Sequence, residues 1–287
     1  MGAVFKREFR SYFTNMTGYV FIGIMWLFCG IFTFALNFLS GYASFEYVLG
    51  NQTIVLMLIV PVLTMRSMAE DRKNKTDQLL FSLPIKTSAV VIGKYLAMVC
   101  VYGVTCLGMG VVPLVLTSFG KVNVLSAFTS LFGFFLLGSA LIAVCMFMSA
   151  LTESQIIAAV LGIGATLALY LMSALASLIP ADEKGSFVGF IVIAAAFGLI
   201  MYLLTKNYWV GLSVGGVLLV PVVILFIAKK SVFEGLLPRI VNYLAAFDRF
   251  NNLSGGVFDI TAVVYYITFA AFFVYLSVQS MEKRRWS

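Results

Sequence analysis

Residues that could carry chemistry are scarce in this chain. It has no histidine, and its four cysteines, Cys29, Cys100, Cys106 and Cys145, lie within apolar runs and lack the spacing of metal ligands. Since zinc and haem sites need histidine or cysteine ligands, we expect no metal centre. No carboxylate lies deep in an apolar run, where it could activate water for hydrolysis. The sequence therefore predicts a protein that is not an enzyme.

A nucleotide-binding loop is also missing. That loop needs Gly-x-x-x-x-Gly-Lys followed by Ser or Thr, so that backbone amides and the lysine can hold phosphates. Here Gly93-Lys94 is followed by Tyr95, and Ser88 stands at the position of the first glycine. We therefore expect this chain to bind no cofactor, and any ATP hydrolysis would need a separate polypeptide.

The composition indicates a polytopic, all-α membrane protein. Of the 287 residues, 62% are hydrophobic and 11% are charged, which leaves too few charges to solvate a water-soluble domain. The net charge of +7 comes from side chains that flank apolar runs. We interpret these charges as topology determinants and contacts to anionic headgroups, and we expect no nucleic-acid partner.

One long charged segment, residues 66–88, interrupts the apolar sequence between two runs that could each span a bilayer. The basic residues in and just after it are Arg66, Arg72, Lys73, Lys75, Lys86 and Lys94. Because Lys and Arg collect in cytoplasmic loops, we place the segment in the cytoplasm. Asn74 or Thr76 could cap a short helix, with Asp77 in its first turn and Pro84 ending it.

The leucines of that short helix are Leu79, Leu80 and Leu83. They could dock into a groove on a soluble partner, or they could lie on the headgroups. The residues alone leave both interpretations open.

Residues 3–16 predict an amphipathic helix in the inner membrane interface. Its apolar side would carry Phe5, Phe9, Tyr12, Phe13 and Met16, and its basic side Lys6, Arg7 and Arg10. The basic side would face anionic lipid or a partner.

Eight membrane spans are expected, with both termini cytoplasmic. The expected ranges are 18–39, 53–68, 89–116, 127–151, 154–178, 187–205, 208–228 and 261–281. Residues 41–52 would form an outer loop, and the third span would bend near its outer end. Residues 231–259 predict an outer interfacial or re-entrant amphipathic helix bent near Pro238. Thirteen basic residues fall inside against six outside, which supports this orientation.

Three local patterns bear on packing and helix ends. Pro61 is expected to kink the second span. Ala158, Gly162 and Thr166 are spaced for close helix packing. Thr152 and Gln155 have the spacing of a capping box, with Glu153 at the positive end of the new helix. This turn is either a second cytosolic contact point or an ordinary helix start.

The chain resembles the membrane subunits of type-2 ABC exporters, and among them the gliding-motility (GldF-like) permease group. The residues that carry the resemblance are Lys6–Arg10, Met65-Arg66, Glu70, Arg72, Thr76, Leu79-Leu80, Pro84, Gly93-Lys94, Leu151–Gln155, Phe247, Phe250, Gly256, Asp259, Val263–Tyr266 and Arg284–Trp286. They occur in the family's order and cover most of residues 1–179 and 240–287.

The resemblance implies one permease domain over residues 1–287. It implies that residues 76–83 form a coupling helix that contacts ABC ATPase subunits, which would bind the ATP and magnesium. Residues 150–155 would form a second contact, and 3–16 the interfacial elbow. The implied coupling residues are Glu70, Arg72, Thr76, Asp77, Leu79, Leu80, Leu83 and Glu153.

The resemblance also implies a second permease subunit, as a homodimer or heterodimer, in a bacterial inner membrane. An auxiliary membrane subunit with an extracellular domain would fit the motility-like arrangement. Two features depart from the family. Many relatives have Ser-Gly-Thr where this chain has Asn74-Lys75-Thr76, and the common form has six spans, so residues 187–228 form an extra hairpin.

The resulting hypothesis is an ATP-driven permease that exports an amphipathic or lipid-like substrate or serves a motility or envelope complex. Two alternatives are a structural membrane anchor and a secondary transporter. The latter usually shows intramembrane acids or paired broken helices, and we find neither in the sequence.

Overall fold

The computed structural model describes residues 2–41, 44–76, 86–180, 182, 185–191, 216, 235–254 and 259–286, and these residues form helices without any strand. Contacts divide the chain into two compact units. The first comprises Met1–Ala168 with Ala246–Ser287, and the second Leu169–Ala245. The single permease domain expected over residues 1–287 stays a prediction. The candidate site described below lies in the first unit.

The helices of the described residues, in chain order, are α1 (Gly2–Thr14), α2 (Thr17–Thr33), the π-helix η1 (Phe34–Leu39), α3 (Phe45–Lys73), α5 (Thr87–Met109), α6 (Val111–Leu116), α7 (Val124–Leu151), α8 (Gln155–Leu178), α11 (Leu236–Leu244), α12 (Ala246–Ser254) and α13 (Ile260–Trp286). Six stretches among them are long and apolar enough to cross a membrane: α2 with η1, α3, α5 with α6, α7, α8 and α13. An all-α, multi-pass membrane protein is thus confirmed. The count of eight spans stays a prediction, because most of 187–228 lies outside the described residues.

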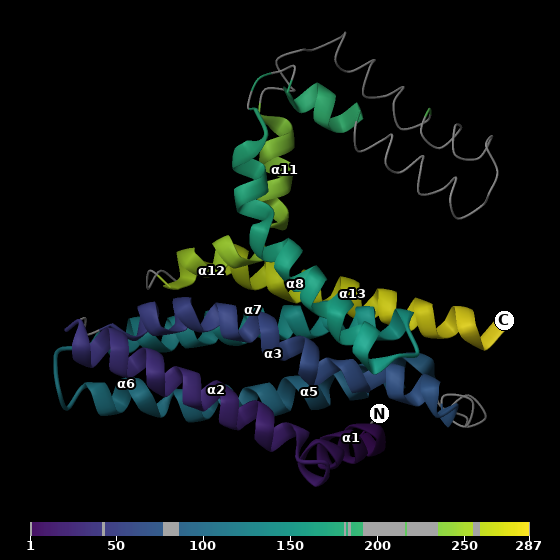
Figure 1. Cartoon of the computed structure of the whole chain (residues 1–287), viewed down its shortest axis with the longest axis horizontal. Coiled ribbons are helices and arrows are strands. Elements are labelled where there is room, and N and C mark those ends of the chain that lie inside the picture. Colours follow the sequence, from purple (N-terminus) through teal and green to yellow (C-terminus); the bar gives the residue numbers. More distant parts are fainter. Residues whose placement is uncertain are drawn as a thin grey trace. The chain divides into compact units, whose positions relative to one another are not determined.

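Helix α7 is the centre of the first unit. Helices α3 and α13 pack along it, and α5 lies beside it as well (Figure 1). Within its membrane window, 72% of α7 is buried inside the protein, against 22% for α2. Glycine permits one close approach, since a Cβ on Gly138 would lie 2.3 Å from the Tyr102 ring of α5. The Tyr102 hydroxyl donates to the Phe134 carbonyl of α7 at 2.7 Å, which joins the two helices.

A proline inside α3 is matched by a threonine on α8. Pro61 has no N–H, so the Met57 carbonyl one turn earlier loses its helical donor. The Thr166 hydroxyl of α8 lies 3.1 Å from that carbonyl and 3.0 Å from Gly162 O of its own helix. The two helices approach closely here because residue 162 is glycine. A Cβ at that position would lie only 3.0 Å from Pro61 Cβ. The predicted small-residue packing of Gly162 and Thr166 is therefore against Pro61.

Several expected helix ends are wrong. The outer loop expected at 41–52 is much shorter, because α3 already begins at Phe45, after Ser44 and with Glu46 in its first turn. At its other end α3 continues to Lys73, so the first part of the charged segment 66–88 is helix and not loop. The third span is interrupted at Gly110, since α5 ends at Met109 and α6 begins at Val111, and the tilt or bend expected there stays a prediction.

The turn between α7 and α8 also differs from the expected capping box. Thr152 is the C-cap of α7, and its hydroxyl oxygen accepts from the Ser154 N–H at 3.2 Å. The Ser154 carbonyl accepts the first bond of α8, from Ala158 N–H at 2.9 Å. The helix therefore begins at Gln155, and Glu153 lies in the turn before it.

Residues 231–259 contain two described helices, α11 and α12, where one was expected, and the chain breaks at Ala245 and not at Pro238. Helix α12 belongs to the first unit, where Phe247, Phe250 and Leu253 are buried. Its Ser254 carbonyl accepts from the Ser130 hydroxyl of α7 at 3.3 Å. Helix α12 is thus packed into the helical core.

The match between Pro61 and Thr166 predicts a specific coupling between two substitutions. Thr166→Val removes the hydroxyl donor and should lower the free energy of unfolding by about 1 kcal/mol. In a Pro61→Ala background the loss should be smaller, because the new N–H can bond to Met57 O while the Cβ at position 61 is kept. Thermal unfolding in detergent of the two single variants and the double variant measures this.

Thr129→Val, at a half-buried position of α7, serves as the control, because the Thr129 hydroxyl bonds to its own helix, at Leu125 O. If Thr166→Val lowered the free energy of unfolding equally in both backgrounds, the bond from Thr166 to Met57 O would be contradicted.

Candidate functional site

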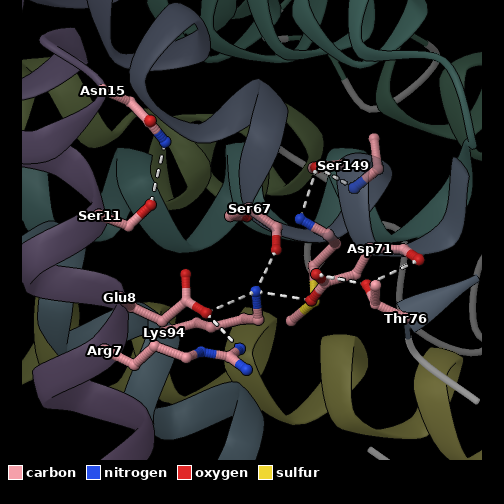
Figure 2. A network of polar contacts seen from close by, with 11 residues as sticks. Arg7, Glu8, Ser11, Asn15, Ser67, Asp71, Thr76, Lys94 and Ser149 are labelled. Atoms are coloured by element: carbon pink, nitrogen blue, oxygen red, sulfur yellow. Dashed lines mark hydrogen bonds and ion pairs between the residues drawn. The ribbon is translucent and has the colours of Figure 1, made fainter. Parts of the chain in front are cut away.

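A buried lysine ammonium joins three helices of the first unit. Lys94, in the second turn of α5, has a side chain that is 3% exposed. Its Nζ donates to the Ser67 carbonyl at 2.7 Å and lies 2.8 Å from Asp71 Oδ2 and 3.3 Å from Glu8 Oε1 (Figure 2). The ammonium thus donates one hydrogen bond, to Ser67 O, and forms ion pairs with both carboxylates. Lys94 therefore binds α1 and α3 to α5.

Each carboxylate beside Lys94 has a further donor. Glu8 Oε1 accepts from Arg7 Nη2 at 2.6 Å, and Asp71 Oδ1 accepts from the Thr76 hydroxyl at 3.0 Å. Burying an ammonium costs several kcal/mol unless it is paired and hydrogen-bonded, and here both conditions are met. We call Arg7, Glu8, Asp71, Thr76 and Lys94 the ion cluster, which has no net charge.

The end of α3 leads from the ion cluster into the segment predicted to couple. Asn74 is the C-cap of α3, and its N–H donates to the Glu70 carbonyl at 3.0 Å. Lys75 follows with φ 56°, a left-handed conformation that usually falls to glycine after a helix. Lysine thus occupies a position that glycine usually takes after a helix, and the turn conformation is the one that glycine favours.

A serine hydroxyl joins α3 to α7 one turn before the ion cluster. Ser149 Oγ accepts from the backbone N–H of Ala69 at 3.1 Å and of Met68 at 3.3 Å, and it donates to Met65 O at 3.1 Å (Figure 2). Ser149 is completely buried. The hydroxyl is therefore inserted into the last turns of α3.

Helix α13 joins the same end of the bundle. Arg72 Nη2 donates to Ser280 Oγ at 3.3 Å, and that hydroxyl donates to Ala150 O at 3.2 Å. Arg284 Nη2 lies 2.5 Å from Glu153 Oε1. The final turns of α3 are thus bound by polar contacts to α5, α7 and α13, and through Lys94 to α1, and we call this region the charged end of the bundle.

The predicted coupling residues are partly brought together there. A hollow of about 360 Å³ is lined by Lys73 of α3 and by residues 153–156, which places the end of α3 beside the turn before α8. Glu70, Arg72, Thr76 and Glu153 all lie at the charged end. Asp77, Leu79, Leu80 and Leu83 lie outside the described residues, so the helix over 76–83 stays a prediction.

The amphipathic helix expected at 3–16 is present as α1, but it ends at Thr14, so Met16, expected on its apolar side, lies outside it. Lys6, Arg7 and Arg10 are exposed, and Phe5, Phe9 and Phe13 form a row of ring contacts at centroid distances of 5.9 and 5.1 Å. Tyr12, expected on the Phe side, is instead buried. Its burial, together with the carboxylates of Glu8 and Glu70, raises the pKa of its hydroxyl. Helix α1 therefore has a third side, which faces α5.

Sequence reasoning missed four residues of this region: Glu8, Asp71, Lys94 and Ser149. Two of them gave a usable signal. Glu8 is an acid in a basic helix, and Lys94 lies within an apolar stretch, where a charge needs a partner. Ser149 gave no such signal, because the hydroxyl of a serine in a helix usually bonds to a carbonyl of the same helix. Within the described residues, no cluster of three His, Cys, Asp or Glu could hold a metal ion.

Comparison with known families agrees with this arrangement. Residues 20–205 match the model of the family described as ABC-2 family transporter protein, which is well over half of the chain. The chain belongs to the ABC-2 transporter family. No curated protein and no solved structure is significantly similar to it. As an ABC-2 membrane domain it is a permease subunit, embedded in the membrane, of a transporter whose ATPase is an ABC protein.

The buried ammonium of this ABC-2 permease predicts a large loss of stability when it is removed. Lys94→Met keeps the length of the side chain but leaves Glu8 and Asp71 without their shared cation. The free energy of unfolding should fall by about 3 kcal/mol, because both carboxylates stay largely buried. Thermal unfolding of the purified protein in detergent measures it.

Lys6→Met, at an exposed position of α1, is the matched control and should change little. Adding Asp71→Asn to Lys94→Met should recover part of the loss. Wild-type stability of Lys94→Met would contradict the ion cluster as described.

Proposed function

We propose that this chain is the permease subunit of an ATP-driven exporter and that its charged end receives the movement of the ATPase. One observation carries the proposal: the last turns of α3, immediately before residues 77–85, are bound to α5, α7 and α13, and through Lys94 to α1. A push on the segment after α3 would therefore act on most of the first unit at once. The charged end would then face the cytoplasm, with both termini on that side of a bacterial inner membrane.

The proposed mechanism is a rigid-body shift. ATP binding closes two ATPase subunits, which press on a coupling helix over 76–83. Thr76 and Asp71 take the displacement into α3, and Lys94 with Glu8 carries it to α5 and α1. Packed helices change between discrete arrangements instead of deforming continuously, so the path in the membrane changes its access.

A second ATPase contact is proposed at Thr152–Gln155. Glu153 is 62% exposed and still forms an ion pair with Arg284. A partner that binds this turn would therefore act on α13 as well as on α8. The hollow between Lys73 and this turn is accessible to the same partner, so both contacts can be pushed together.

The substrate that fits best is amphipathic or lipid-like. No charged side chain lies near the middle of a described span, where it would cost roughly 2.5–3.5 kcal/mol, so a strongly charged small substrate would find no counter-charge on these helices. The proposed assembly is a dimer of permease subunits with the path between them. The GldF-like sequence pattern supports a motility or envelope complex with an auxiliary membrane subunit.

Replacing the proposed docking leucines tests this function. The double substitution Leu79→Asp and Leu80→Asp should abolish the stimulation of ATPase activity by the permease, because two carboxylates cannot be buried in an apolar groove. The measurement is ATP hydrolysis by the complex reconstituted in liposomes, with and without permease.

Gln78→Glu adds a charge to the same segment and should leave stimulation near the wild-type value. Undiminished stimulation in the double variant would contradict the coupling helix. Loss of stimulation in Gln78→Glu as well would show that charge alone, and not the leucine contact, is responsible.

A further inference from the structure

A second polar feature lies beside the ion cluster. A hollow of about 280 Å³ is lined by α1, by Thr17 at the start of α2, by Lys94 of α5 and by the end of α3, which contributes Arg66 and Glu70. Asn15 donates to Ser11 Oγ at 3.1 Å along one wall (Figure 2). The hollow is large enough for a small polar group and several waters.

Two charges of the hollow are not used by the protein itself. Arg7, Glu8, Asp71 and Lys94 neutralise one another in the ion cluster. Among the residues that the structure describes, Arg66 and Glu70 take part in no ion pair and their side chains form no hydrogen bond. They are four residues apart on α3, which is a rise of about 6 Å, so both reach the same hollow. The hollow therefore presents one spare cation and one spare anion.

The depth of the hollow points to a lipid. Thr17 begins the first spanning helix, and Lys94 is in the second turn of another. The hollow thus lies where the apolar spans end, which is the headgroup level of a bilayer. Helix α1 also presents the row of Phe5, Phe9 and Phe13 rings, an apolar surface along which acyl chains could lie.

We propose that this hollow binds the headgroup of a phosphoethanolamine lipid, with the phosphate on Arg66 and the ammonium on Glu70. The two groups of that headgroup are opposite in charge and close together, as Arg66 and Glu70 are. A purely anionic headgroup would bring its charge toward Glu70. A choline headgroup has no N–H to donate to the carboxylate. The proposal depends on membrane embedding alone and not on the proposed coupling to the ATPase.

Lipid retention tests the proposal. The full-length protein is equilibrated in nanodiscs with equal parts of phosphatidylethanolamine, phosphatidylcholine and phosphatidylglycerol, extracted mildly, and analysed by native mass spectrometry. The wild type should retain phosphatidylethanolamine in preference to the other two lipids. Arg66→Gln and Glu70→Gln should each lower its retention about tenfold, the effect of losing one charge-assisted hydrogen bond.

The matched control is Arg10→Gln, which removes an exposed cation of α1 that does not line the hollow and should retain the lipid as the wild type does. Soluble glycerophosphoethanolamine, which carries the headgroup without acyl chains, is added in excess before extraction. It should displace little of the bound lipid. The comparison of the three lipids uses the wild-type protein, so it does not depend on the folding of any variant.

Preferential retention of phosphatidylglycerol would overturn the proposal, as would equal retention of all three lipids. Retention unchanged in both Arg66→Gln and Glu70→Gln would also overturn it. Full displacement by the soluble compound would assign the site to a free metabolite and overturn the lipid assignment.

Discussion

The buried ammonium of Lys94 is the interaction on which the rest of this end of the molecule depends. It donates to the Ser67 carbonyl and forms ion pairs with Glu8 and Asp71, so it fixes the start of α5 against α1 and α3. Because a buried charge is tolerated only when it is fully paired, these helices cannot separate without exposing it or leaving it unpaired. The cluster therefore restrains three helices to move together.

Helix α3 is held differently along its length. At its charged end, side chains of three other helices bond to it, and Ser149 is inserted into its backbone. Near its middle, Pro61 removes one helical hydrogen bond, and Thr166 replaces the donor from α8. Helix α3 is thus supported by α8 at Pro61, where it lacks a helical hydrogen bond, and it is bound to its neighbours at the charged end. That combination suits a helix that transmits a displacement.

How far the sequence predicted this structure depends on the range of each interaction. Apolar runs identified the six described spans, and the periodicity of residues 3–16 identified α1, because both signals are local. The expected end of the second span at Met68 was wrong by five residues. Helix α3 continues through the charged residues to Lys73 and ends at the C-cap Asn74. The capping box was wrong because Thr152 caps the preceding helix instead. The pairing of Lys94 with Glu8 was not predicted, since it joins residues far apart in sequence that only the packing of α1 against α5 brings together.

The most direct test of the account is whether α1, α3 and α5 move as one body when the ATPase works. Spin labels on Arg10→Cys, Lys73→Cys and Lys86→Cys, placed in pairs in a chain whose four native cysteines are replaced, report the distances between these helices by pulsed electron paramagnetic resonance. Labels at Lys73→Cys in the two permease subunits of the proposed dimer report the movement itself. The account predicts that trapping the complex with ATP changes the distance between subunits and leaves the three distances within a subunit unchanged. Distances within a subunit that change as much as the distance between subunits would contradict it.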